Sequence, residues 1–157
     1  MKKVYVETTV FSFYYDDRRS PEVVAMRNWT REWWKKYRPG YEVITSTAVL
    51  AELERGRLAH RRRALKMAQT LPAIAGYGET EDVVRFYIEH KLMPRNPLGD
   101  ALHLALASME NCDYLLTWNC QHLANASKFG HIRRVNAILG LHVPFLVTPM
   151  ELMEEET

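Results

Sequence analysis

Short apolar runs alternate with helix-forming segments along the chain, and this alternation constrains the fold more than any other feature of the sequence. Strand-like composition occurs in four places: residues 3–6, 41–45, 114–117 and 145–148. Helix signals fill the sequence between them, over residues 21–37, 46–56, 58–70, 80–92, 98–109 and 127–139. Strands separated by helices need crossover connections, which produce a parallel sheet. We therefore predict an α/β fold in which helices flank a short, mostly parallel sheet of four to five strands.

The length of 157 residues is that of one domain with a sizeable core. We predict a single domain over residues 1–150 and an acidic C-terminal tail over residues 151–157. The hydrophobic fraction of 47% argues against a disordered chain. No stretch approaches the roughly 18 consecutive apolar residues that a membrane helix needs, so we expect no membrane partner.

The first residues of the chain and its cysteines both bear on the cellular compartment of the protein. Residues 1–6 resemble the beginning of a secretory signal, but Glu7 interrupts the apolar run that such a signal requires. The two cysteines, Cys112 and Cys120, are too few for a disulfide scaffold and lack the spacing of a metal knuckle. Free thiols suit a reducing compartment, so we expect a cytoplasmic protein.

Acidic and amide side chains stand where predicted strands end and where the following helices begin. Glu7 follows the first predicted strand and Asn119 the third, while Asp100 lies in the first turn of a helix. Glu52 lies deeper in its helix, and its side chain can reach back toward the helix start. Sites in parallel sheets form beyond the carboxyl ends of the strands, so we expect these four residues to meet there. Three carboxylates of this kind predict a Mg²⁺ or Mn²⁺ site held by Glu7, Glu52 and Asp100.

Single acids can also have purely structural explanations. A helix dipole favours an acid at Asp100 whatever its function, and a lone Glu52 would more often be exposed. The helix around Asp100, however, is apolar on almost all sides after an expected Asn96-Pro97 start, so it should be buried. An acid at the mouth of a buried helix needs a partner or a metal. Asp113 begins its strand, about 13 Å from the far edge, and we interpret it as structural.

Five segments, in this order and spread over nearly the whole chain, carry a family resemblance. They are VYVETTV (residues 4–10), STAVLAEL (46–53), GDALHLA (99–105), DYLLTWN (113–119) and TPMEL (148–152). Together they resemble the PIN-domain family, and most closely the VapC-type toxins of bacterial and archaeal toxin–antitoxin pairs. The resemblance implies a three-layer PIN-like α/β/α fold, Mg²⁺ or Mn²⁺ held by acidic residues, and hydrolysis of RNA phosphodiester bonds. It also implies a cognate antitoxin as partner and a homodimer.

Position by position, the resemblance assigns the acidic places to Glu7, Glu52, Asp100 and, in the more variable fourth place, Asn119. Hydroxyl groups that support the acids in the family fall on Thr9 and Thr117. We expect His103, three residues after Asp100, to pack beside the acids as a supporting residue. Two departures matter: Glu7 stands where the family usually has aspartate, and Asn119 is neutral. With three carboxylates, one ion should bind more readily than two, and a second could arrive with substrate phosphate.

Positive charge is concentrated just after Glu52, although the formal net charge of the chain is only +2. The arginines there are Arg55, Arg57, Arg61, Arg62 and Arg63. A basic surface beside an acidic site is what cleavage of a polyanion requires, so we predict that these arginines bind RNA. The alternative interpretation is an ordinary solvated helix face.

Aromatic residues recur at helical spacing in the first long helical segment. Trp29, Trp33 and Tyr37 are four residues apart, which places them on one helical face. A stacking platform for single-stranded bases is one interpretation. We favour core packing or a partner interface, because an amphipathic helix commonly buries such a face.

The leading hypothesis is a metal-dependent endoribonuclease that acts as the toxin of a VapBC-type pair. Neither a Ser-His-Asp or Cys-His arrangement nor a glycine-rich phosphate loop competes with it. One alternative, suggested by Glu7 and Asn119, is a catalytically silent PIN-like module that binds RNA or protein. Another is a DNA-directed nuclease of the same fold.

Overall fold

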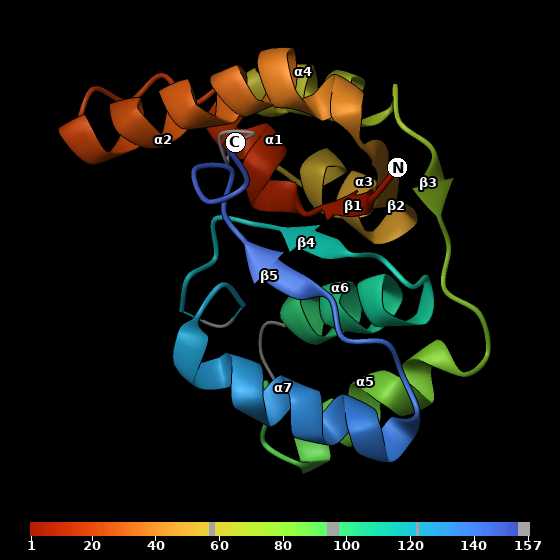
Figure 1. The fold of residues 1–157 in the computed structure, drawn as a ribbon. Helices are drawn as coiled ribbons and strands as arrows, with labels where there is room; N and C mark the ends of the chain where they lie inside the picture. The colour runs from red at the N-terminus through yellow and green to blue at the C-terminus, as the bar shows by residue number, and fades with distance from the viewer. Residues whose placement is uncertain (57–58, 94–97, 122, 154–157) are drawn as a thin grey trace.

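The computed structural model describes residues 1–56, 59–93, 98–121 and 123–153, and its centre is a five-stranded sheet (Figure 1). The strands are β1 (Lys3–Val6), β2 (Glu42–Ser46), β3 (Ala73–Ile74), β4 (Tyr114–Leu116) and β5 (Phe145–Val147). Their order across the sheet is β3-β2-β1-β4-β5, and every neighbouring pair is parallel. The predicted α/β class and the parallel sheet of four to five strands are confirmed.

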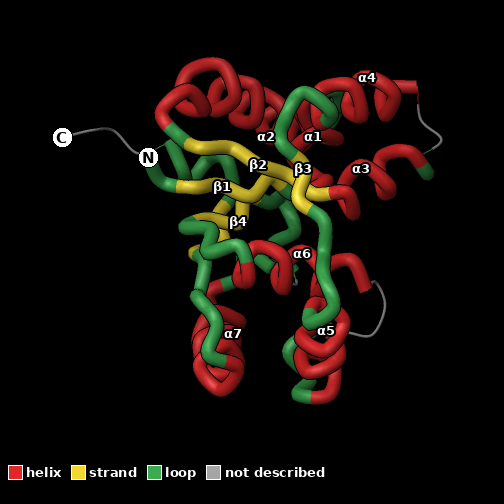
Figure 2. Tube along the Cα trace, turned by 90° about the vertical axis from the view of Figure 1, so that its right-hand side faces the viewer, coloured by secondary structure: helices red, strands yellow, loops and turns green. Residues whose placement is uncertain are grey.

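Helices cover both faces of this sheet. They are α1 (Thr8–Tyr14), α2 (Pro21–Glu32), α3 (Thr47–Glu54), α4 (Ala59–Ala68), α5 (Thr80–Glu89), α6 (Leu98–Met109) and α7 (Ala126–Leu139). Figures 1 and 2 show α1 to α4 on one face and α5 to α7 on the other, so the molecule has three layers, as predicted. Within the described residues, no helix has the length and apolar character that crossing a membrane requires.

The direction of strand addition reverses at β1. The chain places β2 and then β3 on one side of β1, and later returns to place β4 and β5 on the other. A reversal of this kind opens a crevice beyond the carboxyl ends of the two central strands. The register pairs Val6 of β1 with Leu116 of β4, so both strands end level. Glu7 and Thr117, the next residues, therefore lie side by side at the crevice.

Two elements are absent from the sequence-based prediction, α1 and β3. The seven residues of α1 are mostly β-branched or aromatic, so their helix propensity is low. The helix forms because Val10 and Phe11 are buried in the core. The edge strand β3 has only two residues, which pair with Thr45 and Ser46 of β2 and carry little periodic signal of their own.

The predicted helix over residues 21–37 exists, but its last part is not regular α-helix. After α2 the chain makes a π-helical turn (Trp33–Tyr37) and then a 3-10 turn (Arg38–Gly40). The side chains of Trp33 and Trp34 are only 0% and 8% exposed, and the wider turn accompanies the burial of these two adjacent rings. Trp29 stacks on Trp118 with ring centroids 6.2 Å apart, so this aromatic face is packed within the protein.

Several predicted features fall partly or wholly outside the described residues. The predicted Asn96-Pro97 start of the buried helix lies there, as do residues 57–58 ahead of α4 and residues 154–157 of the acidic tail.

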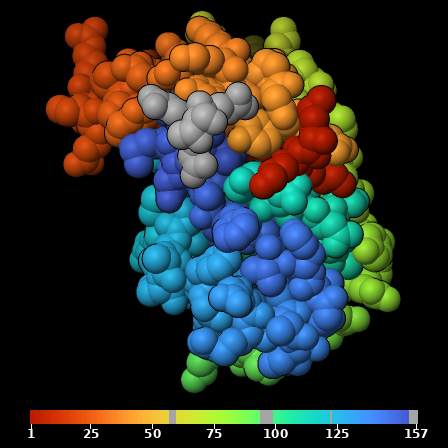
Figure 3. Space-filling model, in the orientation of Figure 1, coloured from red at the N-terminus to blue at the C-terminus, as the bar shows by residue number. Residues whose placement is uncertain are grey.

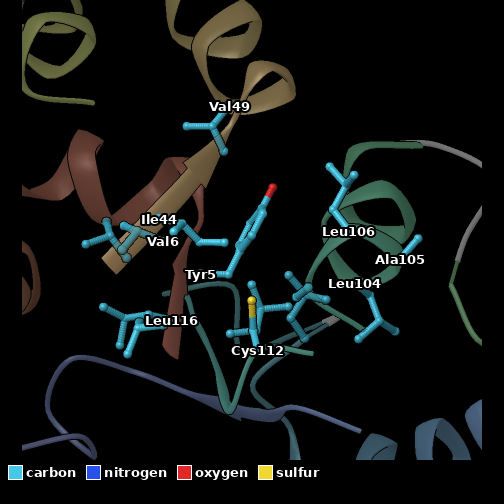
Figure 4. Close-up of a cluster of buried hydrophobic side chains, with 14 of the residues drawn as sticks. Tyr5, Val6, Ile44, Val49, Leu104, Ala105, Leu106, Cys112 and Leu116 are labelled. Atoms are coloured by element: carbon cyan, nitrogen blue, oxygen red, sulfur yellow. The ribbon is translucent and has the colours of Figure 1, made fainter. Parts of the chain in front are cut away.

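The core is built around β1 and α6. The side chains of Val4, Tyr5 and Val6 are fully buried, and α6 contributes buried residues from most of its circumference, as its composition predicts. Figure 4 shows Tyr5 between the strands and α6, with its hydroxyl group at the end of the ring that is farther from Cys112 and Leu116. The Tyr5 side chain therefore extends through the core, and its hydroxyl group reaches Ser46 and His103.

Asn136 of α7 links three helices and provides a test of the packing beneath the sheet. Its amide oxygen accepts from the Tyr87 hydroxyl of α5 (2.7 Å), and its amide nitrogen donates to Ser108 Oγ of α6 and to the His142 carbonyl oxygen (3.0 Å each). Asn136→Ala leaves these buried groups unpaired, so we expect it to lower the free energy of unfolding in urea by about 2 kcal/mol. Asn28→Ala, on an exposed face of α2, should change it by less than about 0.5 kcal/mol. Equal effects of the two substitutions would contradict this account.

Candidate metal centre

Glu7 lies in the crevice because it ends β1 and caps α1 at the same time. Its backbone N donates to the Leu116 carbonyl oxygen at the end of β4 (3.0 Å). Its side chain folds back and accepts from the backbone N of Thr9 in the first turn of α1 (3.2 and 3.3 Å). The hydroxyl groups of Thr9 and Thr117 also donate to its Oε1 (2.5 and 2.7 Å). The additional methylene of Glu7 is thus accommodated by this folded-back, helix-capping conformation.

The carboxylate of Glu7 is deeply buried, since the residue is only 4% exposed. Burial raises the pKa of Glu7, and the charge of His103 and the hydrogen bonds from Thr9 and Thr117 offset only part of that effect. The hydrogen bonds that it accepts come from neutral hydroxyl and amide groups. A buried carboxylate of this kind favours the uptake of a proton or a cation.

A chain of hydrogen bonds through the core holds Glu52 of α3. The Tyr5 hydroxyl group bonds both to Ser46 Oγ (2.6 Å) and to Nδ1 of His103 (2.7 Å). The opposite ring nitrogen of His103, Nε2, lies 2.7 Å from Oε1 of Glu52. The other carboxylate oxygen of Glu52 accepts from the Thr8 hydroxyl group (2.8 Å). Glu52 is therefore fixed from β1, α1 and α6 together.

His103 and Glu52 each shift the pKa of the other, and their contact is an ion pair when His103 is protonated. Burial lowers the pKa of His103, but its hydrogen bond to Glu52 and the charges of Glu7 and Glu52 outweigh this, and the net shift is upward. Partial burial raises the pKa of Glu52, but the hydrogen bond and charge of His103 outweigh this, and the net shift is downward. Because a carboxylate only accepts, Nε2 of His103 carries the proton between them.

One ligand atom from each of Glu7, Glu52 and His103 lies within 4.8 Å of the others, so this group could hold a metal ion. Both ring nitrogens of His103 are already engaged, one by Glu52 and one by Tyr5. The carboxylate oxygens are therefore the better placed ligands. His103 lies behind Glu52, in the supporting place that the sequence suggested for it.

Asp100 and Asn119 also line the crevice and contact each other. Asp100 is buried in the first turn of α6, and its Oδ1 accepts from the Asn119 side-chain amide (3.0 Å). The backbone N of Asn119 in turn donates to Oγ1 of Thr117 (2.9 Å). The neutral Asn119 thus turns its donor toward the carboxylate, an arrangement that an aspartate could not make.

Glu7, Glu52, Asp100 and Asn119, the four residues selected from the sequence, all line one cavity of about 650 Å³. Asp100 is not part of the group of Glu7, Glu52 and His103 whose ligand atoms lie within 4.8 Å of one another. Sequence reasoning missed most of the other walls: Thr8, Ser12, Phe13, Asp16, Asp17, Arg18 and His60. Thr8 and Ser12 are four residues apart, a spacing that marks one face of α1, and Asp16 follows soon after the helix ends. At the rim, Asp16 forms an ion pair with Arg18 (2.7 Å), which holds the pKa of Asp16 below its usual value.

The predicted RNA-binding arginines are distributed unevenly around this cavity. Arg61 lines it, and its guanidinium group donates to the Glu52 carbonyl oxygen (3.5 Å). Exposed positions nearby are occupied by Arg55, Arg62 and Arg63. Arg57 lies outside the described residues.

Gly99 gives Glu52 the room it needs. A Cβ atom at position 99 would lie 2.9 Å from Oε1 of Glu52 and 3.9 Å from Nε2 of His103. The first of these approaches is closer than side chains tolerate, so the carboxylate could not keep its place. Gly99 therefore leaves space for the Glu52 carboxylate, and the next residue, Asp100, provides a second carboxylate.

Asp113 is structural, as interpreted from the sequence. It accepts from the backbone N of Lys3 (2.8 Å), so it joins the amino ends of β1 and β4, away from the crevice. Figure 3 shows the start of the chain, in red, against the teal surface of the segment that leads into β4.

Compared with protein-family models and with curated proteins, the chain matches none of them.

Proposed function

We propose that this chain is a metal-dependent endoribonuclease that hydrolyses RNA phosphodiester bonds, with Mg²⁺ or Mn²⁺ held by Glu7, Glu52 and Asp100. The observation that carries the proposal is that these three carboxylates and Asn119 line one cavity. They come from distant parts of the chain and converge at the strand reversal, where sites form in parallel sheets.

The donor set fits a small, hard divalent cation. Carboxylate and amide oxygens suit Mg²⁺ and Mn²⁺, which are commonly held by one or two carboxylates together with water. Glu7 is buried with a raised pKa, so a cation would relieve the cost of its charge. With Asn119 in place of a fourth acid, we expect one ion to bind more tightly than a second.

When bound, the ion supplies polarisation of the scissile phosphate and a lower pKa for the attacking water. The protein orients its carboxylates through fixed contacts: Thr9 and Thr117 on Glu7, His103 on Glu52, and Asn119 on Asp100. Arg61 places a positive charge in the cavity wall, which offsets the repulsion between phosphate and the acids.

The biological setting of this activity follows from the resemblance to VapC-type toxins. We propose that the chain is the toxin of such a pair, restrained by a cognate antitoxin and acting in the cytoplasm as a homodimer.

The decisive experiment is cleavage of mixed RNA by the purified protein with Mn²⁺, with EDTA, and with Mn²⁺ restored after EDTA. Cleavage should require the metal and return with it. Asp100→Ala should lower the rate at least about 100-fold, because it removes a ligand and the partner of Asn119. Asp82→Ala, an exposed aspartate of α5, is the matched control and should cleave like the wild-type protein.

Other outcomes would redirect the assignment. Cleavage that is insensitive to EDTA or to Asp100→Ala would refute the proposed centre. RNA binding without cleavage in any metal would support a catalytically silent binding module. Faster cleavage of single-stranded DNA than of RNA would indicate a DNA-directed nuclease.

A further inference from the structure

A second cavity, of about 430 Å³, lies beside the candidate metal centre and is built differently. Its walls include Tyr14, Tyr15, Trp34, Arg38, Arg63 and Lys66. These residues come from the end of α1, from the π-helical and 3-10 turns after α2, and from α4. Aromatic rings and cations share this cavity, whereas carboxylates dominate the metal centre.

The aromatic rings of the second cavity are held at fixed angles. The Tyr14 and Tyr15 rings lie 4.9 Å apart at 57°, and the Tyr14 and Trp34 rings lie 6.5 Å apart at 74°. The Arg38 guanidinium group lies 4.7 Å from the centre of the Trp34 ring. Trp34 is only 8% exposed, and Arg31 lies 5.3 Å from the centre of the Tyr14 ring. The Tyr15 ring and the Arg38 guanidinium group are therefore the surfaces on which a nucleic-acid base can stack.

The charge of the second cavity has one sign. Arg38, Arg63 and Lys66 line it, and no carboxylate is among the described residues that do. Within the described parts of the chain, none of these three cations forms an ion pair with a carboxylate. These cations could pair with an anionic ligand instead. The charge of the cavity therefore favours a phosphate-bearing molecule over an apolar peptide.

One face of α4 connects the two cavities. His60 lines the metal-centre cavity, and Arg63 and Met67 line the second one. The spacing of three and then four residues places all three on one side of the helix, within about 10 Å along its axis. On α1, Phe13 lines the first cavity and Tyr14 the second. A single polyanionic strand could therefore lie in both cavities at once.

We propose that this second cavity binds one nucleotide of single-stranded RNA, stacking its base on the Tyr15 ring and pairing its phosphate with Arg63 and Lys66. The inference rests on the proposed function, because it takes the strand that occupies the second cavity to be the one presented to the metal centre. It gives the enzyme a substrate class, unpaired RNA, since a base held in a duplex could not enter a ring-lined cavity.

Binding of a 5′-labelled single-stranded RNA of about eight nucleotides, measured by fluorescence anisotropy in EDTA, tests the inference without catalysis. Tyr15→Ala should weaken binding about tenfold, and Tyr15→Phe should restore it because the ring remains. Lys66→Gln should lower the slope of log affinity against log salt by about 0.7, whereas Lys66→Arg should not. Arg133→Gln, on an exposed part of α7, is the matched control and should bind like the wild-type protein.

Wild-type affinity in both Tyr15→Ala and Lys66→Gln, or no RNA binding by the wild-type protein, would overturn the inference. Lys66 is exposed, so its substitution remains informative even if Tyr15→Ala fails to fold. Tighter binding of an acidic peptide than of the RNA would also overturn it and assign the cavity to a protein partner. If the variants weaken RNA binding but the wild-type protein does not cleave RNA in Mn²⁺, the proposed function fails and the nucleotide site stands.

Discussion

Glu7→Gln is expected to lower Mn²⁺-dependent RNA cleavage about 1000-fold, equivalent to about 4 kcal/mol of barrier, while stabilising the metal-free protein. Glutamine keeps an oxygen that can accept from Thr9 and Thr117 but cannot supply a charged ligand. It also removes a negative charge whose burial is unfavourable, as the raised pKa of Glu7 indicates. We expect the free energy of unfolding in EDTA at pH 7 to rise by about 1 kcal/mol.

The pH dependence of this stabilisation has a defined sign. Because the pKa of Glu7 is raised above its usual value of 4.5, the folded protein holds its proton more tightly than the unfolded chain. The advantage of Glu7→Gln should therefore be small below pH 4.5 and grow as the pH rises through the raised pKa.

Urea denaturation in EDTA at several pH values, with cleavage measured in Mn²⁺, checks both halves of the prediction. Glu81→Gln, on an exposed face of α5, is the control and should change neither quantity appreciably. Full cleavage by Glu7→Gln would exclude Glu7 as a ligand. If Glu7→Gln instead destabilises the protein in EDTA, interactions in the folded protein must compensate the charge of Glu7.

His103→Leu is expected to destabilise the protein by about 3–4 kcal/mol and to reduce cleavage. The substitution removes the partner of both the Tyr5 hydroxyl group and the Glu52 carboxylate, and breaking a buried pair on one side leaves the other group uncompensated. The side chain of Glu52 is 27% exposed, so water screens part of the cost, and the lower end of the usual range applies. Tyr5→Phe removes only a hydroxyl group and should cost about 1 kcal/mol.

A neutral, hydrogen-bonding replacement separates charge from packing at the same position. The pKa of His103 is raised above 6.5, so its stabilising effect is complete below that pH and is lost as the pH rises through the raised value. The pKa of Glu52 is lowered below 4.5, so its effect is present above that pH and is lost under acid conditions. The stability difference between wild type and His103→Gln should therefore be largest between pH 4.5 and 6.5. A difference that is independent of pH would show that His103 is neutral in the folded protein.

The features of the fold that could be predicted from the sequence are those with a strong periodic or terminal signal. The alternation of strands and helices determines the parallel sheet, and the apolar circumference of α6 determines its burial. The helix α1 could not be predicted, because its β-branched and aromatic residues become helical only when Val10 and Phe11 are packed. The strand β3 has two residues and exists only through its pairing with β2.

The contacts of the candidate site likewise include some that the sequence predicts and others that it does not. Glu7, Glu52, Asp100 and Asn119 could be selected because strand ends and helix starts are legible in sequence, and parallel strands bring such positions together. The contact from Tyr5 to His103 could not be predicted, because it depends on how a strand and a helix distant in sequence pack. The second cavity depends on α1 and on the π-helical turn, neither of which has a usable signal in the sequence.

The reversal of strand order at β1 has a consequence for the timing of protein synthesis. Glu7 and Glu52 belong to the half of the chain made first, whereas Asp100, His103 and Asn119 belong to the half made last. The two halves of the centre meet only when β4 has paired with β1. A chain still emerging from the ribosome therefore lacks an assembled centre until the segment from α6 to Asn119 has been translated and β4 has paired with β1.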